Sequence, residues 1–243
     1  RLMARVGICP SVLAGQHQLT AAQALEQLWR ECEWSGVAPT FGCELADGMA
    51  TDCLQGLNIL LDSSGTLRAS LKCFIECLPR VINYIAVELV EAGDFAHLRL
   101  RSQQGQLHHF ALDAAVITLV RNIARRLGGA PGDLFVSVSL RPTQMAGGWL
   151  RGVGIAVEQG EHLCLTLPRY SLDQVLLGAN PFLHQSMLRH WHAETRAPAR
   201  EDNLTMARHW LTAGDQPIER IAERLGYRQP SNFIRAFRKQ FGI

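Results

Sequence analysis

The sequence lacks any apolar run near the roughly 18–20 residues that a membrane-spanning helix needs. No continuous apolar stretch of the secretory type follows the basic residues Arg1 and Arg5. Charged residues are few, at 19%, beside 47% hydrophobic residues, which is the balance of an ordinary globular protein. The 243 residues suffice for one large domain or for a larger and a smaller one. These features predict a cytoplasmic protein without a membrane segment.

Catalytic signatures are also missing. The chain has no GxSxG and no P-loop, and Gly152–Gly154 lacks the third glycine and the following helix of a nucleotide site. His108 and His109 are adjacent in a predicted strand, His190 and His192 lie near a helix end, and none belongs to an HExxH motif. We therefore predict no catalytic residue, no metal ligand and no cofactor, and interpret these histidines as surface or partly satisfied side chains.

The seven cysteines include no metal-type CxxC pair, which favours reduced and mostly buried thiols. Cys73 and Cys77 stand four residues apart and share a face of a predicted helix. They form either a redox pair or part of the core, and the core is the favoured interpretation. The other five are Cys9, Cys32, Cys43, Cys53 and Cys164.

The hydrophobic periodicity changes along the first four-fifths of the chain. A helix is predicted from a capping box at Thr20 to Gly36, and a second from Leu67 to Leu78, ending before Pro79. Alternation then predicts a hairpin of Ala96–Leu100 with Leu107–Leu112. A helix capped by Asp113 and closed by Gly128 and Gly129 is predicted next. Strands are predicted at Leu134–Leu140 and at Leu163–Leu167, the second of them after an Ile155–Val157 run and a Glu158–Gly160 turn. A last helix is predicted to start at Asn180 and Pro181.

This pattern predicts an α+β protein with a mixed N-terminal domain and an all-α C-terminal domain. The mixed N-terminal domain is predicted to span residues 1–193. Residues 194–203 have no period and are predicted to form a linker, and 204–243 form the helical domain.

Positive charge is concentrated in that C-terminal segment. Residues 204–243 contain seven Lys or Arg and three acidic residues, a net charge of +4, which leaves 17 basic and 19 acidic residues before it, a net charge of −2. This asymmetry indicates that the C-terminal segment meets a polyanion.

The same segment has the pattern of a helix, a tight turn and a second helix. A stripe of apolar residues at i, i+3, i+4 and i+7 ends at Gly226, and Pro230 stands where a first helical residue belongs. The stripe consists of Ile218, Ile221, Ala222 and Leu225. The small Ala222 and the glycine in the turn allow two helices to pack at a steep angle.

The second helix separates its side chains into two faces. At about 100° per residue, Phe233, Phe237 and Phe241 fall on one side as an anchor in a core. The donors share the opposite side, namely Ser231, Asn232, Arg235, Arg238 and Lys239. A solvated helix has such a polar face too, but the full combination predicts a helix that offers donors to the major groove. Its first turn would approach base edges, and its later basic residues would meet phosphates.

These two motifs, Ile218–Tyr227 and Pro230–Gly242, closely resemble the second helix-turn-helix of the AraC/XylS family of transcription regulators. Leu204–Leu211 resembles the helix that links the two such units of that family. Residues 1–193 resemble more weakly its N-terminal effector domain, of the arabinose-binding-like type found in ornithine-utilisation and virulence regulators. The resemblance implies that Pro230, Ser231, Asn232 and Arg235 read bases. The residues predicted to bind DNA are Arg228, Gln229, Pro230, Ser231, Asn232, Arg235, Arg238 and Lys239.

The chain departs from the family pattern in two places, one of which is that it stops at Gly242 and Ile243, before the family's usual closing helix. The first helix-turn-helix belongs between the effector domain and the linking helix, but Ala193–Asn203 is too short to hold it. We expect either a true deletion or a segment missing from the printed sequence.

The resemblance implies double-stranded promoter DNA and a small organic or fatty-acid effector as partners, a homodimer, and RNA polymerase if the protein is an activator. Arg68 and Lys72, at i and i+4 of one predicted helix, are candidates to bind an effector carboxylate, although a solvated helix face has the same pattern. Two alternatives remain: an enzyme with an appended basic helical module, and a constitutive DNA-binding protein without an effector.

Overall fold

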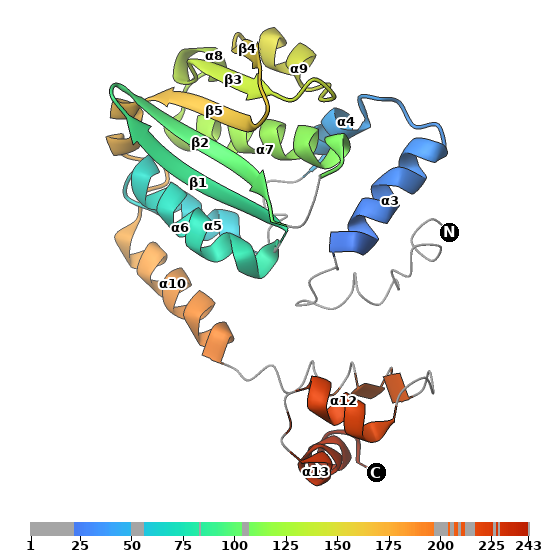
Figure 1. Cartoon of the computed structure of the whole chain (residues 1–243). Coiled ribbons are helices and arrows are strands. Elements are labelled where there is room, and N and C mark those ends of the chain that lie inside the picture. The colour runs from blue at the N-terminus through green and yellow to red at the C-terminus, as the bar shows by residue number, and fades with distance from the viewer. Residues whose placement is uncertain are drawn as a thin grey trace. The chain divides into compact units, whose positions relative to one another are not determined.

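The computed structural model describes residues 22–49, 56–82, 84–103, 107–196, 204, 207–208, 210–211, 217–225, 227 and 229–242. The chain divides into two compact units, residues 1–188 and 189–243, shown in Figure 1. Each unit is described by itself. Within the described residues, no helix is both long enough and apolar enough to cross a bilayer.

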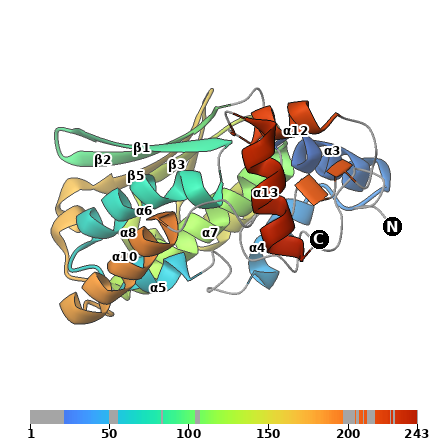
Figure 2. The same cartoon turned by 90° about the horizontal axis from the view of Figure 1, so that it is seen from below.

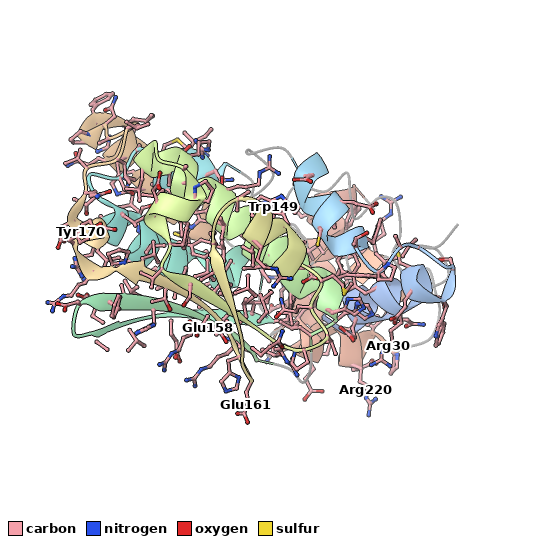
Figure 3. The ribbon with its side chains drawn as sticks, turned by 90° about the horizontal axis from the view of Figure 1, so that it is seen from above. Arg30, Trp149, Glu158, Glu161, Tyr170 and Arg220 are labelled. Carbon is pink, nitrogen blue, oxygen red and sulfur yellow. The ribbon has the colours of Figure 1, made fainter. Side chains whose placement is uncertain are left out.

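The first unit is built on a five-stranded sheet in the order β1-β2-β5-β3-β4. Its strands are β1 (Ile85–Ala92), β2 (Phe95–Ser102), β3 (Ser137–Leu140), β4 (Ala156–Gln159) and β5 (Leu163–Pro168). All neighbouring strands are antiparallel except β3 and β4, which are parallel. β4 forms one edge of the sheet and leaves Glu158 exposed, as Figure 3 shows. A short, charged edge strand discourages pairing with another sheet.

The predicted hairpin of Ala96–Leu100 with Leu107–Leu112 is wrong. β2 pairs with the strand before it, in a register that brings Ala92 opposite Phe95. The two residues between them form the turn, where Gly93 has a φ of 57°, a value that glycine adopts without steric cost. The prediction overlooked β1 and placed the turn one strand too late.

Helices of the first unit cover one face of the sheet, and Figure 2 shows α6 and α7 together on that face. The helices are α3 (Ala22–Trp34), α4 (Phe41–Gly48), α5 (Leu57–Asp62), α6 (Leu67–Val81), α7 (His109–Leu127), α8 (Pro131–Leu134) and α9 (Gly147–Gly152), with a 3-10 helix η1 (Arg169–Asp173). Their apolar faces and the inward side chains of β2 and β5 form the core, in which Leu71, Leu98 and Leu165 are buried. Burial of such side chains drives folding of the unit.

The predicted end of α6 before Pro79 is wrong, because the helix continues to Val81 with the proline inside it. A proline so close to the helix end removes only one backbone hydrogen bond, and few residues follow whose path it could disturb. At the other end, the Thr66 hydroxyl accepts a hydrogen bond from Ala69 N at 3.2 Å. Cys73 and Cys77 of α6 are buried with their Sγ atoms 3.9 Å apart, which confirms them as part of the core.

α7 begins five residues earlier than the sequence indicated. Its N-cap is His108, so His108 and His109 belong to a helix start rather than a strand. Asp113 is not the cap of its own helix. It is fully buried inside α7, where its carboxylate accepts hydrogen bonds from Met145 N and Ala146 N at 3.0–3.1 Å. The predicted end at Gly128, whose φ is 72°, is confirmed.

α10 (Pro181–Arg196) begins in the first unit and ends in the second. Its start is confirmed, since Leu183 N donates to the side chain of Asn180 at 3.0 Å. The helix extends to Arg196, three residues into the predicted linker. Residues 197–203, on which the prediction about the first helix-turn-helix also falls, lie outside the described residues.

Candidate nucleic-acid interface and effector domain

In the second unit, α12 (Ile218–Arg224) and α13 (Pro230–Phe241) have the predicted helix-turn-helix arrangement. Tyr227 N donates to Ala222 O at 2.9 Å and so helps to end α12. α13 begins at Pro230, which needs no backbone donor at a first helical position. It ends at Gly242, whose φ of 69° is left-handed and whose N–H donates to Arg238 O at 2.9 Å.

A small core fixes α13 against α12. Ala222 and Ile221 are fully buried there, and Phe233 is 1% exposed. The Phe233 ring packs edge-on against Tyr227 with centroids 5.6 Å apart, and Phe237 continues the stack at 5.6 Å. This core holds the polar face of α13 in one orientation.

The segment before α12 contributes to the same core, since Leu204 and Ala207 are buried in it. Arg208 was counted in the sequence only as a positive charge. In the structure its guanidinium carbon lies 5.4 Å from the centroid of the Phe241 ring, a cation–π distance. The sequence gave no signal for this contact. Helical periodicity relates residues three or four positions apart, whereas Arg208 and Phe241 are 33 positions apart.

The outward face of α13 carries the residues that the sequence singled out. The exposed ones are Gln229, Pro230, Ser231, Asn232, Arg235, Arg238 and Lys239. Arg228 lies outside the described residues. Across the part of the chain that the structure describes, no carboxylate forms an ion pair with Arg235, Arg238 or Lys239. Their charges are therefore open to an external polyanion.

The other predicted binding residues, Arg68 and Lys72, lie on α6 of the first unit. Arg68 is engaged by two carboxylates: its Nε and Nη2 donate to Asp173 at 2.8 and 3.1 Å, and its Nη1 donates to Glu91. Hydrogen bonds from Arg68 lower the pKa of Asp173 and of Glu91. Lys72 is exposed on the same helix. An effector carboxylate would thus have to displace Asp173 or Glu91 to reach Arg68.

Together, the mixed α/β unit and the basic helix-turn-helix unit define a transcription regulator that joins an effector domain to a DNA-binding domain. A family model described as the arabinose-binding domain of AraC transcription regulators, N-terminal, matches residues 1–174. A helix-turn-helix domain model matches residues 183–243. The chain belongs to the AraC family of transcription regulators, and these matches set the enzyme alternative aside.

Among solved structures, the chain is similar to the crystal structure of transcriptional regulator CdpR from Pseudomonas aeruginosa. The two share 18% sequence identity over 100% of this chain and 96% of that chain, with a TM-score of 0.52. This likeness shows a common fold. No curated protein matches the chain.

Proposed function

We propose that α13 is the reading helix of a sequence-specific regulator and docks in the major groove of promoter DNA. The observation that carries this proposal is the division of α13 into a buried face centred on Phe233 and an exposed face, whose basic side chains form no ion pair among the described residues. A helix held rigidly by its apolar side presents its donors to base edges at little entropic cost.

The donors have different roles along the helix. Ser231, Asn232 and Arg235 are in the first turns, which approach base edges when a recognition helix enters the groove by its N-terminal end. Pro230 opens the helix and belongs with these base-reading residues, while Arg228 and Gln229 precede the helix and support that approach. Arg238 and Lys239 stand in the last turn, where the helix leaves the groove, and contact phosphates.

The different roles of Arg235 and Lys239 predict different losses of DNA affinity when each residue is replaced by alanine. Arg235→Ala removes a planar, bidentate donor from a base edge, so it should cost about 1–3 kcal/mol on the cognate site and relax preference at one base pair. Lys239→Ala removes one phosphate contact, so it should weaken binding to all duplexes alike and lower the salt slope by about one unit. Both variants should be titrated against cognate and scrambled duplexes at several salt concentrations.

Equal losses on cognate and scrambled DNA for Arg235→Ala would remove this residue from base reading. Arg30 on α3, which is exposed in the first unit, provides a matched control, and Arg30→Ala should leave both affinities unchanged. A wild-type protein that is indifferent to sequence in every duplex tried, including its own promoter region, would contradict the proposal.

The effector domain is proposed to bind a small organic molecule or fatty acid and to pass that signal to DNA binding. Support comes from the match of residues 1–174 to an arabinose-binding domain model. Arg68 and Lys72 stay candidates for an anionic effector, with the displacement of Asp173 or Glu91 as the required step. The alternative is a constitutive regulator without an effector.

Effector and DNA binding should be thermodynamically coupled. A true effector is expected to change DNA affinity by a few-fold to about a hundredfold, on the order of 1–3 kcal/mol, and DNA should change effector affinity by the same factor. Native mass spectrometry of the purified protein would reveal a retained small molecule. Titrations of DNA with and without that molecule would then measure the coupling. A bound molecule that alters neither DNA affinity, oligomeric state nor transcription would favour the constitutive alternative.

The family assignment also supports a homodimer on DNA, contact with RNA polymerase if the protein is an activator, and a cytoplasmic location. Half-site spacing in the bound promoter would test the dimer, because two reading helices of a dimer contact sites about one DNA turn apart.

A further inference from the structure

Three side chains that the sequence left without a function meet where the end of α3 packs against the start of α7. Glu33 faces both histidines of the α7 start: its Oε2 lies 3.2 Å from His108 Nε2, and its Oε1 lies 3.5 Å from His109 Nε2. One donor atom from each residue falls within 4.8 Å of the other two. Figures 1 and 2 show α3 beside this end of α7.

The helix start makes the two histidines converge. In the strand that the sequence predicted, consecutive side chains would point to opposite faces. Instead, His108 has extended backbone as the N-cap and His109 is the first helical residue, and their rings stack with centroids 4.6 Å apart and an interplanar angle of 26°. The rings are enclosed, with side chains 7% and 19% exposed, while the Glu33 side chain is 53% exposed. An ion can therefore enter from the Glu33 side.

The spacing fits a tetrahedral metal site. Around an ion with bonds of about 2.0–2.1 Å, two ligand atoms of a tetrahedron lie about 3.3 Å apart. Each histidine nitrogen lies near that distance from one of the two Glu33 oxygens, at 3.2 and 3.5 Å. One donor atom from each of the three residues lies within 4.8 Å of the other two, so the side chains must draw closer together to share one ion.

A second layer of polar groups also suits a metal. His109 Nδ1 is buried, has no hydrogen-bond partner among the residues that the structure describes, and lies 3.9 Å from Asp113 Oδ2. A histidine that binds a metal through Nε2 carries its proton on Nδ1 and donates it to a carboxylate or carbonyl, which orients the ring. The Asp113 carboxylate is already held by the Met145 and Ala146 N–H groups. The Asp113 carboxylate is therefore placed to accept the hydrogen bond from His109 Nδ1.

Metal binding changes two existing contacts of His108. His108 Nδ1 accepts a hydrogen bond from Phe110 N at 3.3 Å, which places the proton of the neutral ring on Nε2, towards Glu33. Coordination through Nε2 moves that proton to Nδ1, gives up this long hydrogen bond and replaces the 3.2 Å hydrogen bond between Nε2 and Glu33. Three metal–ligand bonds would offset these two losses. The Glu26 carboxylate, which accepts from His108 N at 3.1 Å, keeps α3 and α7 together meanwhile.

We propose that Glu33, His108 and His109 bind a zinc-class divalent ion, with Asp113 orienting His109 and a water completing the coordination. Two imidazoles and one carboxylate are a ligand set that zinc accepts, with the fourth position left to solvent. The ion would tie α3 to α7, and so its binding free energy would stabilise the first unit.

Zinc titration calorimetry on the metal-free full chain tests the proposal. The wild type should bind one zinc ion at this site, and Glu33→Gln and His109→Gln should each weaken binding at least tenfold. His108→Asn is the sharpest variant, because asparagine retains an acceptor for the N-cap but not the imidazole ligand. His97→Gln, a change at a β2 histidine whose Nδ1 lies 3.2 Å from Thr166 Oγ1, is the matched control and should bind zinc as the wild type does.

Thermal unfolding gives a readout that separates loss of the site from loss of the fold. Zinc should raise the melting temperature of the wild type and of His97→Gln, and should raise that of Glu33→Gln by clearly less at the same zinc concentration. Glu33 is a half-exposed side chain, so its glutamine variant should fold normally. The proposal is overturned if the wild type binds no zinc, or if zinc binds the Glu33, His108 and His109 variants with wild-type affinity and stoichiometry, which would locate it at other histidines.

Discussion

The Phe233→Ala variant is expected to unfold the C-terminal unit while the first unit stays folded. Phe233 is 1% exposed and packs between Tyr227 and Phe237 in the core that joins α13 to α12. Truncation of a buried phenylalanine costs about 3–5 kcal/mol, from lost burial and the cavity left behind. A unit of residues 189–243 has only a small core, so a loss of this size approaches its whole stability.

Hydrogen exchange measured by mass spectrometry can follow the two units separately. Amides of α12 and α13 should lose protection by about a hundred- to a few thousandfold, since each 1.4 kcal/mol is tenfold, whereas those of α6 and α7 should not change. DNA binding should disappear with that protection. Phe182→Ala is the control, because it removes the same atoms from a side chain that is 79% exposed. Unchanged protection of α13 in Phe233→Ala would show that this core does not hold the reading helix.

The second large effect is expected in the first unit, for Asp62→Ala. Asp62 at the end of α5 accepts from Arg126 Nε at 2.7 Å and from Arg125 Nη2 at 2.8 Å. Arg126 is 5% exposed, and apart from Asp62 its guanidinium donates only to the Asn58 carbonyl at 2.8 Å among the described residues. Removal of Asp62 leaves a buried cation without its counter-charge, which should cost about 3 kcal/mol.

Urea unfolding of matched variants checks the cause of that loss. Asp47→Ala breaks an exposed pair with Arg121, 3.5 Å apart, and should cost less than about 1 kcal/mol. The double variant Asp62→Ala with Arg126→Met removes the charge together with its partner and should recover much of the loss. If it is as unstable as Asp62→Ala alone, the unpaired guanidinium is not the cause.

The Asp62 contribution should also depend on pH. Burial raises the pKa of Asp62, but the hydrogen bonds from Arg125 and Arg126 outweigh burial, and the pKa in the folded state is lower than usual. A carboxyl with a lowered pKa stabilises the fold fully above its unfolded pKa, about 3.9, and loses that effect as the pH falls through its folded pKa. The difference between wild type and Asp62→Ala should therefore shrink below about pH 4 and stay constant from pH 5 to 7.

The sequence alone determined the helix-turn-helix and its two faces. The phenylalanines recur at helical spacing, Pro230 marks the start of α13, and the donors fall on the remaining side. These signals are local: they depend on residues within a few positions of one another, and backbone geometry converts such spacing directly into a face. The ends of α7 at Gly128 and the start of α10 at Asn180 followed for the same reason.

Only the tertiary structure decided how the strands pair and where the polar groups meet. Only three residues separate β4 from β5, yet β4 pairs in parallel with β3, because α9 carries the chain from the end of β3 back to the open edge of that strand. Asp113 was a plausible cap by sequence, but it became a buried acceptor for a loop 32 residues away. Glu33, His108 and His109 looked unrelated for the same reason, since α3 and α7 are brought together by packing between distant segments, which no local pattern records.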